Sequence, residues 1–204
     1  MTSILSLLVN APLLAALLAT PSPARCTTAA QTLDDMLCTF EANVDAYVQL
    51  HRRLEHSVPP QIYTSDLELL FMSRKAMAIA IRRERPLAKQ GDIFSPPVAA
   101  MFRQIVARTL REDRVSWGEF LTEDGMTLPI EVLVNGDYPA GGPVATMTPT
   151  LLKALPPLPP ELQYRIVGDN LVLIDVHASL IVDILPNVLA DLTARSDRLE
   201  GVVS

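Results

Sequence analysis

The sequence predicts an α+β fold, in which an N-terminal helical hairpin or three-helix bundle packs with a small C-terminal antiparallel β-meander. Between residues 31 and 114, three segments repeat apolar residues at steps of three and four, the spacing of amphipathic helices. After Trp117 the period changes, and short runs of Val, Ile and Leu alternate with turn residues. We expect a helical region at 31–114 and an α+β region at 115–204, together forming one domain.

The first predicted helix is a long amphipathic segment that begins just after residue 31. Its apolar residues lie on one stripe, which must be buried. The helix should stop at Val58-Pro59-Pro60, because proline lacks the backbone donor that a helix uses. The stripe consists of Leu33, Met36, Leu37, Phe40, Val44, Tyr47, Val48 and Leu54.

Two further helices are predicted, each with its own start signal. Ser65 can cap the second helix while Glu68, three residues on, completes a capping box, and Pro86 ends the helix. Ser95 followed by Pro96 is typical of a cap and a first helical residue, so a third helix should start there. Their apolar stripes are Leu67, Leu70, Phe71, Met77, Ala78 and Ile81, then Val98, Met101, Phe102, Ile105, Val106 and Leu110.

The C-terminal half favours short strands separated by turns. Residues 128–134 predict a strand that ends at the turn dipeptide Asn135-Gly136. Residues 149–155 favour a short helix, and the prolines of 155–160 predict a stiff connector or a ligand for a proline-binding groove. The meander should then occupy 163–167, 171–175 and 180–185, with both faces partly covered by the helices. The last run could instead be helical, because short apolar runs show no decisive period.

The first 30 residues have the layout of a signal peptide. An uncharged apolar run, Ile4–Leu18, is followed by the small-residue stretch Ala19–Ala30. The run is shorter than the roughly twenty apolar residues that a membrane-spanning helix needs, and it contains Pro12. We therefore expect an exported protein, located in the periplasm or outside the cell.

The cleavage site decides the chemistry of the two cysteines. Cleavage after Ala24 leaves Cys26 and Cys38 in the mature chain, where a disulfide could form in an oxidising compartment. Cleavage after Ala30 leaves Cys38 alone. Since Cys38 lies on a predicted buried stripe, we expect an inert thiol or half of a bridge rather than a nucleophile.

The net charge is −6, but its distribution is uneven. From Phe71 to Arg114 ten basic residues face four acidic ones, while both flanks are acidic. The basic centre could be neutralised within the fold, or it could form a patch that binds anionic lipid headgroups or an acidic partner. Acidic overall charge and the export signal argue against nucleic acid. The patch would comprise Arg74, Lys75, Arg82, Arg83, Arg85 and Lys89.

Known catalytic motifs are missing from the sequence, which has no Gly-rich phosphate loop, Gly-x-Ser-x-Gly, His-Glu-x-x-His or Cys-x-x-Cys. We therefore assign no catalytic, cofactor-binding or metal-binding residue and expect no cofactor. His51 and Glu55 lie one helical turn apart and could hold a metal with His56 or a nearby acid. The same spacing is common on a solvated helix face, and we favour this interpretation of His51 and Glu55 over a metal site.

Two other groups could be given a chemical role. His177 falls in a predicted turn between Asp175 and Asp183, where a surface position is more common than a catalytic one. Trp117 stands near the acids Glu119, Glu123 and Asp124, which admits a carbohydrate hydrolase with a tryptophan platform and paired carboxylates.

Three phrases resemble a family of uncharacterised exported bacterial proteins. They are Leu50-His51-Arg52-Arg53-Leu54, Gln90-Gly91-Asp92-Ile93-Phe94, and the stretch from Tyr164-Arg165-Ile166-Val167-Gly168 through Asp175. The resemblance implies export and brings no activity, cofactor or catalytic residue.

We expect a non-catalytic envelope accessory or binding protein whose partner is a protein or an anionic envelope component. The alternatives are an envelope hydrolase that uses carboxylates and a metal-responsive periplasmic protein.

Overall fold

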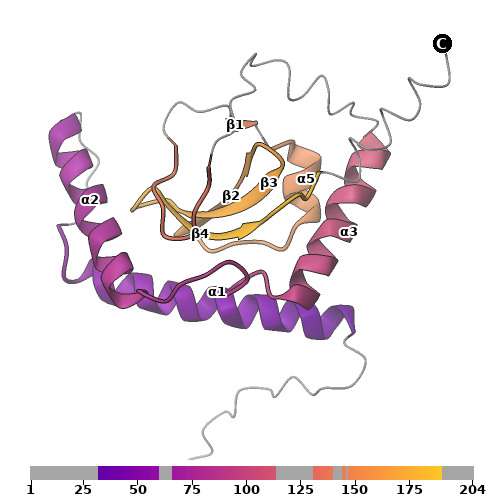
Figure 1. Cartoon of the computed structure of the whole chain (residues 1–204), viewed down its shortest axis with the longest axis horizontal. Helices are drawn as coiled ribbons and strands as arrows, with labels where there is room; N and C mark the ends of the chain where they lie inside the picture. The colour runs from indigo at the N-terminus through magenta and orange to yellow at the C-terminus, as the bar shows by residue number, and fades with distance from the viewer. Residues whose placement is uncertain (1–31, 60–65, 114–130, 140–143, 146, 190–204) are drawn as a thin grey trace, which may run out of the picture.

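The computed structural model describes residues 32–59, 66–113, 131–139, 144–145 and 147–189. It confirms the α+β class, with helices in the N-terminal half and an antiparallel sheet in the C-terminal half (Figure 1). The elements are α1 (Leu33–Glu55), α2 (Leu67–Glu84), α3 (Pro96–Asp113), β1 (Val144–Ala145), α5 (Pro149–Ala154), β2 (Leu162–Val167), β3 (Asn170–Asp175) and β4 (Leu180–Leu185).

The three long helices form a frame around the sheet. Helix α1 runs along the base of the molecule in Figure 1, and α2 and α3 rise from its two ends with the sheet between them. Both α2 and α3 pack on α1, and α5 packs on α3. No helix among the described residues is long and apolar enough to cross a membrane.

The starts of the helices follow from their flanking residues, with two differences from the sequence expectation. Thr32 caps α1 in a capping box with Asp35, so the first helix begins where its apolar stripe begins. Helix α2 is capped by Asp66, whose carboxylate accepts from two backbone N–H groups, whereas the expected cap Ser65 lies outside the described residues. Helix α3 begins at Pro96 as predicted, but the hydroxyl of Ser95 is buried without a hydrogen-bond partner.

The sheet has the order β1-β2-β3-β4, and each neighbouring pair is antiparallel. The three strands of the meander lie within one residue of their predicted bounds, and 180–185 is a strand rather than a helix. Gly168, with φ of 56°, makes the β2–β3 turn, a backbone region that glycine enters without strain.

The strand predicted at 128–134 is wrong for the part that the structure describes, since residues 131–134 are not in a strand. The predicted turn is present, because the Gly136 N–H donates to the Leu133 carbonyl at 2.8 Å. Beyond it a single antiparallel bridge joins Asp137 to Leu180. Three backbone hydrogen bonds between residues 135–138 and residues 179–181 hold the segment along the start of β4. Residues 128–130 lie outside the described residues.

Two apolar clusters cover the two faces of the sheet. The main core joins side chains of α1, α2 and α3 to one face, with Phe40, Phe102 and Met77 fully buried at its centre. The second cluster lies on the other face, where Val132, Val134 and Tyr138 pack against strand residues. The helices therefore supply one cover and the 131–138 segment contributes to the other, which differs from the expectation that helices cover both.

Asp183 fixes the connection between α2 and α3. Its buried carboxylate accepts hydrogen bonds from the backbone N–H groups of Gly91, Ile93 and Phe94 at 2.7 to 2.9 Å, and from its neighbour Ile184 at 2.7 Å. Gly91 has a φ of 90°, a conformation that favours glycine. The carboxylate thus satisfies donors that the loop could not pair by itself.

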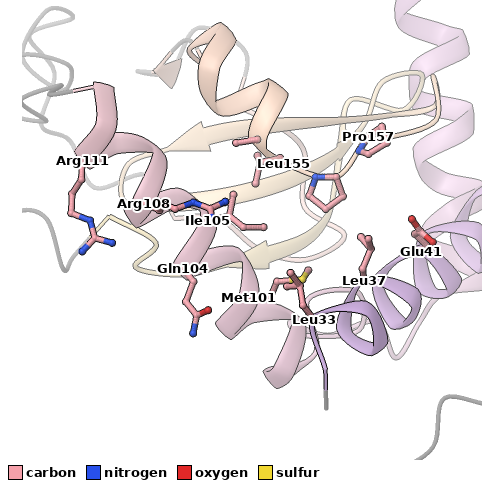
Figure 2. Close-up of a pocket in the computed structure, with 12 residues that line it drawn as sticks. Leu33, Leu37, Glu41, Met101, Gln104, Ile105, Arg108, Arg111, Leu155 and Pro157 are labelled. Atoms are coloured by element: carbon pink, nitrogen blue, oxygen red, sulfur yellow. The ribbon is translucent and has the colours of Figure 1, made fainter. Parts of the chain in front are cut away.

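Two prolines of the predicted connector, Pro156 and Pro157, line a cavity. The cavity has a volume of about 590 Å³. Figure 2 shows its lining from α1, α3 and this connector, which includes the apolar Leu37, Met101 and Leu155 and the charged Glu41 and Arg108. The Tyr164 hydroxyl donates to the Pro156 carbonyl at 3.1 Å, which ties the connector to β2. No histidine or cysteine lines this cavity, so the chemistry of the chain has to be sought elsewhere.

Candidate functional site

Two histidine side chains are in contact near the C-terminal end of α1. His51 and Glu55 lie one turn apart on α1, and His177 comes from the turn between β3 and β4. The two histidines are 1% and 2% exposed, and their ring centroids are 6.0 Å apart. The side chain of Glu55 is 43% exposed, so the cluster opens to solvent on one side.

Asp175 orients the first histidine. Its Oδ2 atom lies 2.5 Å from Nδ1 of His51 and accepts a hydrogen bond from the Tyr47 hydroxyl at 2.8 Å. Its Oδ1 atom accepts from the backbone N–H of Ala178 at 2.7 Å. A carboxylate only accepts, so the Nδ1 atom of His51 carries the proton of this pair, and the ring presents its Nε2 lone pair to the cluster when it is neutral.

Ser73 orients the second histidine. Its hydroxyl lies 3.0 Å from the Pro59 carbonyl and 2.9 Å from Nε2 of His177. The carbonyl can only accept, so the single serine proton goes to Pro59 and the serine oxygen accepts from the Nε2–H of His177. The Nδ1 atom of His177 is therefore left with a lone pair, and this buried atom has no hydrogen-bond partner among the residues that the structure describes.

The two ring nitrogens that remain converge on one carboxylate oxygen. The Oε1 atom of Glu55 lies 3.5 Å from Nε2 of His51 and 3.4 Å from Nδ1 of His177. All three atoms lie within 4.8 Å of one another. With both rings neutral, two lone pairs face a carboxylate that is partly exposed, and either a metal ion or a proton on Nε2 of His51 relieves their repulsion.

The two histidines differ in their affinity for protons. Burial lowers the pKa of His51, but the hydrogen bond and charge of Asp175, with a smaller effect of Glu55, outweigh it and raise that pKa above its usual value. Burial lowers the pKa of His177 by more than Asp175 and Glu55 raise it. In the absence of a metal, the site therefore holds its proton on His51 and keeps His177 neutral.

The structure corrects several sequence expectations for this region. His51 does not belong to a solvated face and His177 is not at the surface, because the β3–β4 turn packs against α1 and α2, where His177 contacts Glu55 and Ser73. His56 does not join the cluster. It is exposed, and its Nδ1 atom lies 2.6 Å from the Arg52 carbonyl. Asp183 serves the α2–α3 loop and not His177.

The order Ser73, His177, Glu55 also has the composition of a hydrolase triad, but its geometry does not support nucleophilic catalysis. The serine hydroxyl donates to Pro59 instead of to the histidine, and Ser73 is 3% exposed in the middle of α2. A nucleophile must reach its substrate and lose its proton to the base. Ser73 does neither and acts as a support for the imidazole.

The other sequence candidates lie apart from the cluster or outside the described residues. Trp117, Glu119, Glu123 and Asp124 belong to the segment that the structure does not describe. Cys38 is half-buried on α1, and Cys26 lies outside the described residues.

Some residues of the predicted basic patch are paired with acidic residues, and others are not. Arg82 pairs with Asp137, and Arg85 packs over the Tyr47 ring and lies 3.7 Å from Asp92. Arg74, Lys75 and Arg83 form no ion pair within the described part of the chain.

Comparison with known protein families, with curated proteins and with solved structures finds no match for this chain. The resemblance to exported bacterial proteins therefore stays a prediction, and the function has to be argued from the site itself.

Proposed function

We propose that this protein binds a divalent transition-metal ion through Nε2 of His51, Oε1 of Glu55 and Nδ1 of His177. The proposal departs from the sequence expectation of no metal ligand. The observation that carries it is the convergence of two buried, pre-oriented imidazole lone pairs on one carboxylate oxygen. Imidazole and carboxylate are common ligands for such ions.

The spacing of the three atoms suits a metal centre. With metal–ligand bonds of about 2.1 Å, the ligands of a tetrahedral site lie about 3.4 Å apart. The two distances from Glu55 to the histidine nitrogens are 3.4 and 3.5 Å. Two of the three separations therefore match, and the two histidine nitrogens lie within 4.8 Å of each other, so side-chain rotation has to set the third.

The outer contacts match those of metal-binding histidines. Such histidines usually donate their second N–H to a carboxylate, carbonyl or water, which fixes the ring and its tautomer. Here Asp175 accepts from His51, and Ser73 accepts from His177 while donating to Pro59. Both rings are therefore held with the correct nitrogen toward the site before a metal arrives.

Three protein ligands leave at least one coordination position open. Because Glu55 is partly exposed, that position faces solvent and permits exchange of the ion. Two imidazoles and one carboxylate favour Zn²⁺, Fe²⁺, Co²⁺ or Ni²⁺ over Ca²⁺ and Mg²⁺, which prefer all-oxygen sites.

The proposed role is that of an exported, non-catalytic binding protein whose ligand is the metal. The apolar run Ile4–Leu18 supports export. A binding protein whose ligand is a metal ion agrees with two hypotheses from the sequence, the binding protein and the metal-responsive periplasmic protein. The hydrolase alternative would use carboxylates between Glu119 and Asp137. Of these, Glu119, Glu123 and Asp124 lie in the segment that the structure does not describe, and Asp137 pairs with Arg82.

Calorimetric titration of the chelator-treated protein with Zn²⁺, Co²⁺ and Mg²⁺ tests the proposal. We expect one equivalent of Zn²⁺ or Co²⁺ to bind and Mg²⁺ not to bind at the site. Bound Co²⁺ should also give the visible absorption of a nitrogen- and oxygen-ligated ion. The variants His177→Gln and Glu55→Gln should lose more affinity than the about 10- to 100-fold typical of an outer contact.

Matched controls lie on the same helix. His56→Gln removes an exposed histidine outside the cluster, and Glu41→Gln neutralises an exposed glutamate on α1. Both should bind Zn²⁺ like the wild type. Equal binding by His177→Gln and the wild type, in protein shown to be folded by circular dichroism, would contradict the proposed site.

A further inference from the structure

The outer face of α2 exposes an unusual amount of apolar surface. Five large apolar side chains of this one helix are exposed: Leu67 at 78%, Leu69 at 50%, Phe71 at 62%, Met72 at 57% and Ile79 at 54%. They make up half of the exposed large apolar side chains in the described part of the chain. Apolar residues gathered in this way mark an interaction surface more often than isolated ones do.

Cations are interleaved with these apolar residues. Arg74, Lys75 and Arg83 are exposed on α2, and none of them has an ion pair within the described residues. Lys75 lies over the Phe71 ring, 5.8 Å from its centroid, so apolar and basic groups are in direct contact. Glu68 and Glu84 are the acidic residues of the helix and stand at its two ends.

The helix is placed so that this face is accessible. Helix α2 lies at one edge of the molecule, and its N-terminal half extends away from the sheet (Figure 1). Its buried side consists of Ser73, Met77, Ala78 and Ile81, which leaves the opposite side facing outward. The site at Ser73 and the outer face of α2 are therefore on different sides of one helix.

A cavity beside α2 is also lined by both apolar and basic side chains. It has a volume of about 310 Å³ and lies between α2 and two turns, with Phe71, Ile79 and Tyr138 as apolar lining. Arg74 and Lys75 also line it. A hollow with cations beside apolar side chains suits an amphiphile with an anionic head.

We propose that the outer face of α2 binds the surface of a bilayer that contains anionic phospholipids. Apolar side chains enter the boundary between headgroups and acyl chains, and basic side chains contact the anionic headgroups. The exposed cations favour a membrane over a protein partner, because basic residues without an ion pair among apolar ones match anionic headgroups, and Lys is depleted from protein interfaces. The face is on α2 and does not involve the metal ligands, so the two proposals stand independently.

Flotation with vesicles tests the inference. The protein is purified with the N-terminus that it carries in the cell and mixed with vesicles of phosphatidylcholine alone or with phosphatidylglycerol added. We expect binding only to the anionic vesicles, with a marked decrease when salt is raised from about 0.1 M to about 0.5 M. The double variant Phe71→Ser/Ile79→Ser and the single variant Lys75→Glu should each lower the partition coefficient, the double variant by about tenfold or more.

Matched controls distinguish vesicle binding by the outer face of α2 from nonspecific vesicle binding by any exposed apolar or basic side chain. The double variant Leu133→Ser/Leu152→Ser removes two exposed leucines elsewhere, and Lys153→Glu reverses an exposed lysine on α5. Both should bind anionic vesicles like the wild type. Equal binding to neutral vesicles, or wild-type binding by the α2 variants, would overturn the inference. So would a dimer in light scattering that the α2 variants abolish, because the face would then be a protein interface.

Discussion

The carboxylate of Asp175 lies 2.5 Å from Nδ1 of His51, although 124 residues separate the two in the sequence. Both side chains are fully buried. This contact joins the end of β3 to the last turns of α1 and fixes the nitrogen that His51 presents to Glu55. The candidate metal site therefore depends on how the sheet packs against the first helix.

Replacing Asp175 by Asn should weaken metal binding without removing a ligand. The amide keeps the shape of the side chain but loses the charge that orients and polarises His51, so we expect an about 10- to 100-fold loss of Zn²⁺ affinity. Calorimetric titration measures it. Tyr47→Phe removes one hydrogen bond to the same carboxylate and leaves the histidine contact in place, so its loss should be smaller. If the two variants lose affinity equally, the polarising role of Asp175 is wrong.

Metal binding should stabilise the fold, because the ligands come from α1 and from the β3–β4 turn. At a free Zn²⁺ concentration 100 times the dissociation constant, the native state gains about 2.7 kcal/mol. Thermal unfolding should show a higher Tm for the wild type with Zn²⁺ than with a chelator. Glu55→Gln lacks one of the proposed ligands, so adding Zn²⁺ should change its Tm little. The variant should still fold, because the substituted side chain is partly exposed and is not needed for packing. A Tm increase of wild-type size in this variant would argue for a different binding site.

In the metal-free protein, His51 should make stability depend on pH in a particular direction. Its pKa in the fold is raised above the usual value near 6.5. The stabilisation from protonated His51 is therefore fully present below that value and is lost as the pH rises through the folded pKa. We expect the difference in free energy of unfolding between the wild type and His51→Gln to narrow as the pH rises above about 6.5 and through the raised pKa of His51. Urea denaturation in the presence of a chelator measures it, and a widening difference would contradict the proton assignment.

The local order of this chain could be predicted from its sequence, and the site could not. The three meander strands lie within one residue of their predicted bounds because turn residues separate compact apolar runs. The strand prediction fails at 131–134, because Val132 and Val134 cover a sheet face without joining the sheet, while Leu133 is exposed.

The candidate site escaped prediction because its contacts are long-range. Ser73 and His177 are 104 residues apart, and Tyr47 was correctly placed on a buried stripe while its hydroxyl contact with Asp175 left no sequence signal. The i,i+4 spacing of His51 and Glu55 did indicate that these two side chains lie together. Only the packing of the β3–β4 turn against α1 supplied the third ligand, His177 instead of the neighbouring His56.

The carboxylate of Asp183 should be among the most sensitive groups in the fold. It is fully buried and accepts from four backbone N–H groups, three of them in the loop between α2 and α3. Asp183→Ala leaves these donors without a partner, so we expect a loss of about 3 kcal/mol or more in the free energy of unfolding. Urea denaturation measures it, with the exposed turn residue in Asp169→Ala as the control. A loss as small as that of the control would mean that water replaces the carboxylate and that the loop does not depend on it.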